Sequence, residues 1–264
     1  MKDELTYGDG VPSTVLAFDT ATAAFSAAIV RNGARADAVA NFAERNHSVR
    51  IVSEIKELLS RNGLKGEELD AIAVGQGPGS YTGVRIAVSA AKTLAWAWNI
   101  PLIGVSSLEA LALGAWRKLR EESETLADDR EIWFVPILDA RRGQVYTGRY
   151  AAGRSNDWRS VDADGIRLID DWAGKIEAEG TQDADVAAIW FVGDVDVHAA
   201  AIEKAEQTGT RLRMMKYEMD ATAVGLLGER KFRRGERSDV HGFVPNYTQL
   251  AEAEAKLLAA SRGE

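Results

Sequence analysis

The stretch Gly75-Gln76-Gly77-Pro78-Gly79-Ser80-Tyr81-Thr82-Gly83-Val84-Arg85 decides the fold class of this chain. Apolar residues at 71–74 precede it, as in a buried strand, and small and apolar residues follow it as far as Trp98, as in a helix. Glycine permits a positive φ and a close approach of the backbone, and proline fixes its own φ. The stretch therefore predicts a tight strand-to-helix turn that ends at the unpaired N–H groups of a helix's first turn.

This turn does not match the common nucleotide-binding fingerprints. A Walker A loop ends in Gly-Lys followed by Ser or Thr, whereas this turn ends in Gly83-Val84-Arg85. The spacing of Gly77, Gly79 and Gly83 also misses the dinucleotide pattern by one residue. Two interpretations stay open on the loop chemistry alone: an anion site at the helix start, and a sharp connection that binds no ligand.

The hydrophobic pattern around the turn predicts an ordered series of elements. Strands are expected at 15–19, 25–30, 36–42, 71–74 and 102–105, and helices from His47 to about Asn62 and as far as Trp98. The order partly restarts with a strand at 132–139 and another at 145–150, followed by a strand at 187–192 and by helices around 197–207, from Ala221 and from Leu250. This order predicts mixed sheets with helices on their faces.

The repeated unit carries an aspartate at the end of its first strand, Asp19 in one half and Asp139 in the other. We therefore expect an α/β protein with the actin-like ATPase (ribonuclease H-like) fold, built from two duplicated lobes. Residues 1–13 are expected to form a flexible extension, 14–116 the first lobe and 117–244 the second. A C-terminal helix at 245–264 is expected to pack back on the first lobe.

Composition excludes several classes of protein. A net charge of −8 argues against a stand-alone nucleic-acid binder, which would carry a basic patch. The absence of cysteine excludes disulfides, thiolate nucleophiles and cysteine zinc sites. No apolar run is long enough to span a bilayer, and residues 1–13 lack a signal-peptide core. We expect a cytoplasmic protein with no membrane contact.

The string from Gly77 to Ile86, with Ala-Lys-Thr-Leu-Ala at 91–95, resembles the signature of the TsaB (YeaZ) family. Further similar segments lie at 16–22, 47–48, 104–111, 138–142 and 145–146, so the resemblance is dense from about 14 to 150. Near the end, residues 245–249 are similar to the family's Pro-x-Tyr-x-Arg, with Gln249 where the family has Arg. The family belongs to the actin-like superfamily, so the resemblance implies the same fold as the pattern.

The chemistry expected of an actin-like ATPase is incomplete in this sequence. The turns after Asp19 and Asp139 lack the adjacent glycine that lets a phosphate approach the backbone, so we interpret them as the remnant of a phosphate site. Two roles stay open for the aspartates: holding a hydrated metal and, favoured by the pattern, capping or orienting the turn. In the catalytic paralogue TsaD two histidines spaced H-x-x-x-H bind a metal, and Ser107 and Leu111 stand at those positions here. Leucine binds no metal, and neutral serine is a poor ligand. We expect no cofactor, no metal and no catalytic residue.

Two of the expected helices are candidates for a protein–protein interface. The helix at 83–98 is rich in alanine and apolar over more than one face, which favours either burial within the protein or close packing on another chain. Relatives in the family use this helix and the one before it to pair with themselves or with TsaD. The partner-binding residues that this implies are His47, Ile51, Ile55, Arg85, Val88, Ser89 and Lys92, and the signature loop comprises Gly77, Pro78, Gly79, Ser80, Thr82 and Gly83.

The resemblance implies a non-catalytic scaffold for threonylcarbamoyl transfer to adenosine 37 of tRNA. Such a scaffold would bind TsaD and the ATPase TsaE, would form a homodimer when alone, and would meet tRNA only through the complex. Two alternatives stay open. The strand-end aspartates would suit an actin-like ATPase or small-molecule kinase, and the similarity to TsaD-like proteins once thought to be proteases raises a metallopeptidase, the weakest of the three.

Overall fold

The computed structural model describes residues 12–41, 47–122, 130–153, 157–206 and 211–248, without the side chains of 47–50. Its first half forms one mixed sheet, two helices that flank it and a third helix that follows its last strand. The strands of this sheet are β1 (Thr14–Asp19), β2 (Phe25–Arg31), β3 (Ala34–Asn41), β4 (Ala71–Gly75) and β5 (Leu102–Val105). The helices are α1 (His47–Arg61), α2 (Tyr81–Trp98) and α3 (Ser107–Glu122), with a short 3₁₀ turn at Gly66–Glu68.

The second half repeats this series of elements. Its strands are β6 (Glu131–Asp139), β7 (Gln144–Ala152), β8 (Trp158–Leu168), β9 (Val186–Gly193) and β10 (Leu212–Lys216). Its helices are α4 (Ile169–Gln182), α5 (Val195–Ala205) and α6 (Ala221–Arg233). The sheets have the orders β3-β2-β1-β4-β5 and β10-β9-β6-β7-β8, which is the same order when the second is reversed. The first strand of each half pairs antiparallel with the next strand and parallel with the fourth. The duplication predicted from two aspartates is therefore present throughout, and the fold is the actin-like ATPase fold.

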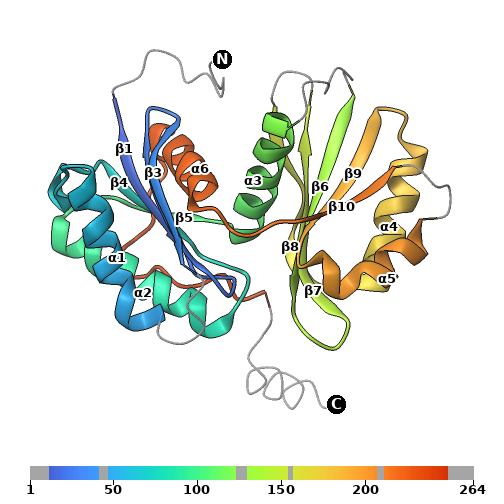
Figure 1. Cartoon of the computed structure of the whole chain (residues 1–264), viewed down its shortest axis with the longest axis horizontal. Helices are drawn as coiled ribbons and strands as arrows, with labels where there is room; N and C mark the ends of the chain where they lie inside the picture. The colour runs from blue at the N-terminus through green and yellow to red at the C-terminus, as the bar shows by residue number, and fades with distance from the viewer. Residues whose placement is uncertain (1–11, 42–46, 123–129, 154–156, 207–210, 249–264) are drawn as a thin grey trace.

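The elements stack in five layers (Figure 1). Helices α1 and α2 cover the outer face of the first sheet, where Leu16, Phe18 and Ile72 are fully buried against them. Helices α4 and α5 cover the outer face of the second sheet around Phe191. Helices α3 and α6 fill the layer between the two sheets, and one apolar cluster there contains residues of both sheets and both helices. The two lobes therefore share their central core.

The predicted division of the lobes differs from the contacts of two helices. Helix α3 continues past residue 116 and packs on β6, β7 and β9 of the second sheet. Helix α6, which the division placed in the second lobe, packs on β1, β2 and β4 of the first sheet. Each central helix follows the last strand of one half and lies over the sheet of the other. Strands β8 and β10 and helices α3 and α4 were not predicted at all.

Both chain ends of the described part depart from the prediction. Ser13 is buried and donates its hydroxyl to Glu229 of α6, so it belongs to the fold and not to an extension. Residues 245–248 are not helical, and the N–H of Asn246 bonds to the Gln76 carbonyl at 2.7 Å. Residues 1–11 and the remainder of the predicted C-terminal helix lie outside the described residues. None of the described helices has the length and apolar character needed to cross a bilayer.

Candidate functional site

Asp19, the strand-end aspartate of the first half, is fully buried. Its carboxylate accepts the Ser107 hydroxyl at 2.5 Å and the N–H of Ala21 at 2.5 Å. Burial raises the pKa of this carboxyl, and the two hydrogen bonds partly offset the rise. A Cβ on Gly75 would stand 1.6 Å from an oxygen of Asp19, so the glycine at the end of β4 makes the space that the carboxylate occupies. Asp19 therefore holds the Ala21 N–H and the Ser107 hydroxyl in place, and its side chain has no exposed surface.

The signature loop bonds to the β1–β2 turn. Ser80 caps α2 by accepting the N–H of Gly83, and its own N–H donates to the Ala21 carbonyl at 2.8 Å. A Cβ on Gly79 would lie 2.5 Å from the Ala21 carbonyl oxygen, and one on Gly83 would lie 2.0 Å from that of Thr20. Gly77 has a φ of 87° and donates its N–H to the Ser107 hydroxyl. These contacts support the interpretation of a sharp connection whose glycines permit close packing within the protein.

The other two predicted loop residues lie beside these contacts. Pro78 is buried, and Thr82 is exposed on the first turn of α2. Thr82 also lines a groove between α1 and α2 that is described below.

The matching turn in the second half is more open. Asp139 lies at the end of β6 with about a third of its side chain exposed, 3.1 Å from Nε2 of the buried His198. It also accepts the N–H of Arg141 at 3.2 Å. Arg141 and Arg142 have positive φ values of 68° and 55°, and the carboxylate supports this tight turn. The described contacts of Asp139 are those of a turn-orienting residue.

The positions of the TsaD histidines point inward in this protein. Ser107 is fully buried with its hydroxyl on Asp19, and Leu111 is fully buried in the central core. Among the residues that the structure describes, no three His, Asp or Glu side chains converge to hold a metal ion. His198 and His241 lie in different parts of the fold, on α5 and in the segment after α6.

An apolar groove runs between α1 and α2 on the outer face of the molecule. Its volume is about 540 Å³, and it is bordered by Val52 of α1 and by Ile86 and Leu94 of α2. A second hollow of about 360 Å³ shares Val52 and Leu94 and continues to Trp98. Val52, Tyr81 and Trp96 are large side chains that are 55%, 56% and 69% exposed on these two helices. Exposed apolar surface of this kind is typical of an interaction site.

The predicted partner-binding residues divide into four groups. Arg85 and Ser89 are exposed and line the groove. Ile51, Ile55 and Val88 are buried at 1%, 1% and 3% exposure and so offer a partner little surface, although Ile51 borders the groove and Ile55 borders the second hollow. They lie on the faces of α1 and α2 that pack on the protein's own core. His47 begins α1, and its side chain is outside the described part.

Lys92, the last predicted contact, holds another part of the chain. Its ammonium donates to the carbonyls of His241 and Phe243, each at 2.9 Å. Phe243 packs on Val84 and Val88 of α2. We call residues 236–248 the C-terminal strap: Ser238 pairs with Leu102 of β5, a turn follows at 240–242, and the part from Phe243 onward lies along the signature loop and α2. Tyr247 of the strap accepts from Nε of Arg85 at 2.9 Å.

Val52 and Trp96, two exposed residues that we did not predict, could have been found from their positions around each helix. Val52 lies next to Ile51, and a step of one residue turns the side chain about 100° around a helix, away from the buried stripe. Trp96 is likewise off the buried stripe that ends with Ala91 and Ala95. A large apolar residue in such a position is the feature that marks the outer face. The contact of Tyr247 with α2 had no local signal, because it joins residues 162 positions apart.

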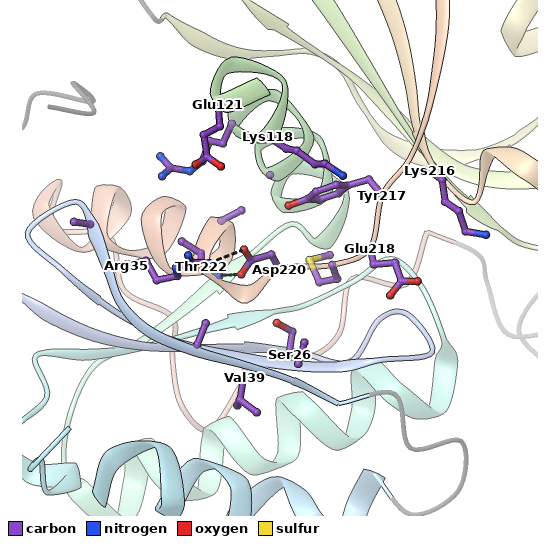
Figure 2. A pocket seen from close by; sticks show the side chains of 17 residues that line it. Ser26, Arg35, Val39, Lys118, Glu121, Lys216, Tyr217, Glu218, Asp220 and Thr222 are labelled. Atoms are coloured by element: carbon purple, nitrogen blue, oxygen red, sulfur yellow. Dashed lines mark hydrogen bonds and ion pairs between the residues drawn. The ribbon is translucent and has the colours of Figure 1, made fainter. Parts of the chain in front are cut away.

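Another cavity lies between the lobes, away from this groove. It encloses about 900 Å³ between the edge strand β3, helix α3 and the connection from β10 to α6. Figure 2 shows Asp220 at the start of α6, where its carboxylate accepts the N–H of Thr222. The carboxylate stands at the helix N-terminus, where an anion would otherwise be stabilised. The start of α6 is therefore already occupied by a carboxylate of the chain itself.

The fold is that of the actin-like ATPases, and its first strand-end aspartate is enclosed by Ala21, Gly75 and Ser107. Comparison with known proteins specifies the group further. The model of the TsaD family, described as tRNA N6-adenosine threonylcarbamoyltransferase, matches residues 38–257. A tRNA threonylcarbamoyladenosine biosynthesis protein TsaB from Bacillus subtilis is 35% identical, over 94% of this chain and 100% of that protein. The chain belongs to the TsaB (YeaZ) family.

Other relatives agree with this assignment. TsaB from Escherichia coli is 36% identical over 58% of this chain and 61% of that protein. The solved structure of YeaZ from Pseudomonas aeruginosa superposes with a TM-score of 0.68 at 27% identity, covering 89% of this chain and 99% of that one. The resemblance drawn from the signature loop is therefore confirmed.

Proposed function

We propose that this chain is a non-catalytic subunit in the biosynthesis of threonylcarbamoyladenosine in tRNA. In this proposal it binds the catalytic paralogue TsaD through the α1–α2 groove and acts together with the ATPase TsaE. Alone, it pairs with a second copy through the same face, and it meets tRNA only within the complex. The names of its relatives support the pathway, and the structure supports the manner of action.

One contrast carries the proposal. The positions that would hold phosphate or metal in a catalytic relative are occupied by contacts inside the protein, namely Asp19 with Ser107 and the buried Leu111. The outer helices, in contrast, expose Val52 and Tyr81 on an apolar groove, and α2 also exposes Trp96. A protein whose interior positions are closed and whose surface is apolar has the features of a binding subunit.

The decisive experiment is light scattering after size-exclusion chromatography, with TsaD of the same organism. We expect a stable complex that Val52→Glu weakens about tenfold or more, because a charge must then enter an apolar interface. Val197→Glu is the matched control, since Val197 is 71% exposed on α5, in the outer layer of the opposite lobe. Val88 is unsuitable for this test because it is buried, so its replacement would report on folding.

Failure to form a complex with TsaD, both with and without TsaE and nucleotide, would contradict the proposal. If Val52→Glu and Val197→Glu weakened the complex equally, TsaD binding would stand but the α1–α2 groove would be rejected as the interface. Micromolar binding of Mg-ATP by the chain alone would instead favour the ATPase alternative.

A further inference from the structure

The exposed Arg85 lies at the start of α2, where it lines the α1–α2 groove. Two aromatic side chains hold its guanidinium, whose central carbon is 3.8 Å from the ring centre of Tyr81 and 5.5 Å from that of Tyr247. Its Nε donates to the Tyr247 hydroxyl at 2.9 Å. The two tyrosines are themselves 56% and 49% exposed. The guanidinium is therefore fixed in orientation on a surface that stays open to a partner.

This guanidinium has no carboxylate partner among the residues that the structure describes. Its described contacts are the two tyrosine rings and the Tyr247 hydroxyl, which uses Nε and leaves the terminal nitrogens Nη1 and Nη2. Arg61 on α1, in contrast, pairs with Asp37 at 3.0 Å. The two terminal nitrogens of an arginine form a planar fork that binds both oxygens of one carboxylate. Arg85 is thus an oriented fork without its anion.

The groove beside Arg85 indicates which anion fits. Arg85 is the only Arg or Lys among the described residues that line it, and its neighbours there include Val52, Ile86 and Leu94. The ammonium of Lys92, further along α2, is used by two carbonyls of the C-terminal strap. A nucleic-acid backbone is bound by several basic side chains together. A single guanidinium beside an apolar surface instead suits one carboxylate at the rim of a protein interface.

We propose that Arg85 binds a carboxylate side chain of TsaD, and that Tyr81 and Tyr247 orient it for that contact. This inference rests on the proposed function. It extends the interface from the groove onto the C-terminal strap, because Tyr247 belongs to the strap. Tyrosine and arginine are among the side chains that most often dominate the binding energy of an interface.

The test is the affinity for TsaD of the same organism, measured over a series of salt concentrations. We expect Arg85→Gln to weaken the complex about tenfold or more and to make its affinity less dependent on salt, because a charge pair is removed. Arg85→Lys keeps the charge without the planar fork, so it should weaken binding less and keep most of the salt dependence.

Arg213→Gln is the matched control for the loss of one positive charge. Arg213 is exposed on β10, and its described contact is the Leu212 carbonyl, so its replacement should change neither the affinity nor the salt dependence. Equal melting temperatures of the parent and the variants would show that any effect belongs to binding and not to folding.

Tyr247→Phe tests the orientation of Arg85 separately from its charge. This variant keeps the ring and removes the hydroxyl that accepts from Nε. We expect weaker binding with the salt dependence of the parent. An affinity equal to that of the parent would reject the orienting role of the Tyr247 hydroxyl.

Three outcomes would overturn the contact with a carboxylate. If Arg85→Gln weakened binding but kept the salt dependence of the parent, Arg85 would act by packing alone. If Arg85→Gln left the affinity for TsaD unchanged and lowered only the binding of tRNA by the assembled complex, the anion would be a phosphate. If the parent formed no complex with TsaD, the proposed function would fail together with this inference, whereas a stable parent complex that Arg85→Gln does not weaken would reject this inference alone.

Discussion

Asp19 is a residue whose role in the fold is opposite to the one its position suggests. A strand-end aspartate in an actin-like protein would face the cleft, yet this one is enclosed by Ala21, Gly75 and Ser107. Two donors satisfy its oxygens, and burial raises its pKa because the charged form is removed from water. Its contribution is the attachment of the β1–β2 turn to the start of α3.

The raised pKa of Asp19 predicts a specific dependence of stability on pH. The folded state binds the carboxyl proton more tightly than the unfolded state, so the contribution of Asp19 is complete below about pH 4, the unfolded value. It is lost as pH rises through the folded pKa. Asp19→Asn should remove this loss, and urea unfolding at several pH values should show the variant gaining stability relative to the parent as pH rises above 4. Parallel pH profiles for the two proteins would contradict the interpretation.

At the scale of elements, the signature loop acts as a packing device between a hairpin and a helix. Gly79 and Gly83 lie directly against the carbonyl oxygens of Ala21 and Thr20. The hydroxyl of Thr20 also donates to the Gly83 carbonyl at 2.6 Å. The absence of side chains at these glycines is required by the protein itself, whatever the loop binds.

Replacing one of these glycines should therefore destabilise the fold strongly. For Gly83→Ala we expect a loss of about 1–3 kcal/mol or more, because the new Cβ must displace backbone atoms. Gly174→Ala is the control, since Gly174 lies in helix α4 with no atom within 4 Å of a new Cβ, and alanine should stabilise it by up to about 1 kcal/mol. Urea unfolding with a common m-value measures both changes. A Gly83→Ala variant as stable as the parent would remove the packing argument.

The strands and helices differ in how clearly the sequence predicts them. Strands such as β1 and β6 were predicted because they are continuous apolar runs that end in aspartate. Strand β8 was missed because it carries charged residues and is half-exposed along its length, and α4 was missed because Asp170-Asp171 reads as a solvated charge run. The α1–α2 pair was selected, but the side of each helix was not, because both sides of α2 carry apolar residues.

At the scale of the whole molecule, a polar cluster joins the two halves beside the shared core. Asp164 of β8 accepts the hydroxyl of Ser106 at 2.6 Å and that of Tyr150. Glu109 of α3 accepts from Trp158 of β8 and from Arg230 of α6, each at 3.1 Å. Burial raises the pKa of Asp164, which indicates that its position between the lobes is partly closed to water.

Removing the central acceptor of this cluster should destabilise the molecule as one unit. Asp164→Ala leaves two hydroxyls without their acceptor, and we expect a loss of about 1–3 kcal/mol. The exposed Asp157, replaced by alanine, should change stability by less than about 0.5 kcal/mol. Calorimetry should still show one transition, because α3 and α6 belong to both halves. Two separate transitions in Asp164→Ala would contradict a shared core.

Because α3 and α6 each lie on the sheet of the other half, the chain cannot be cut between the halves without removing a helix from each sheet. A fragment that ends after α3 contains the first sheet without α6, and it leaves the faces of β1, β2 and β4 open to solvent. The remaining fragment contains the second sheet without α3, and so has the same defect. Neither fragment is a self-sufficient folding unit, although a mixture of the two holds every layer. Separately expressed halves should thus be insoluble alone and should reconstitute one another when produced together.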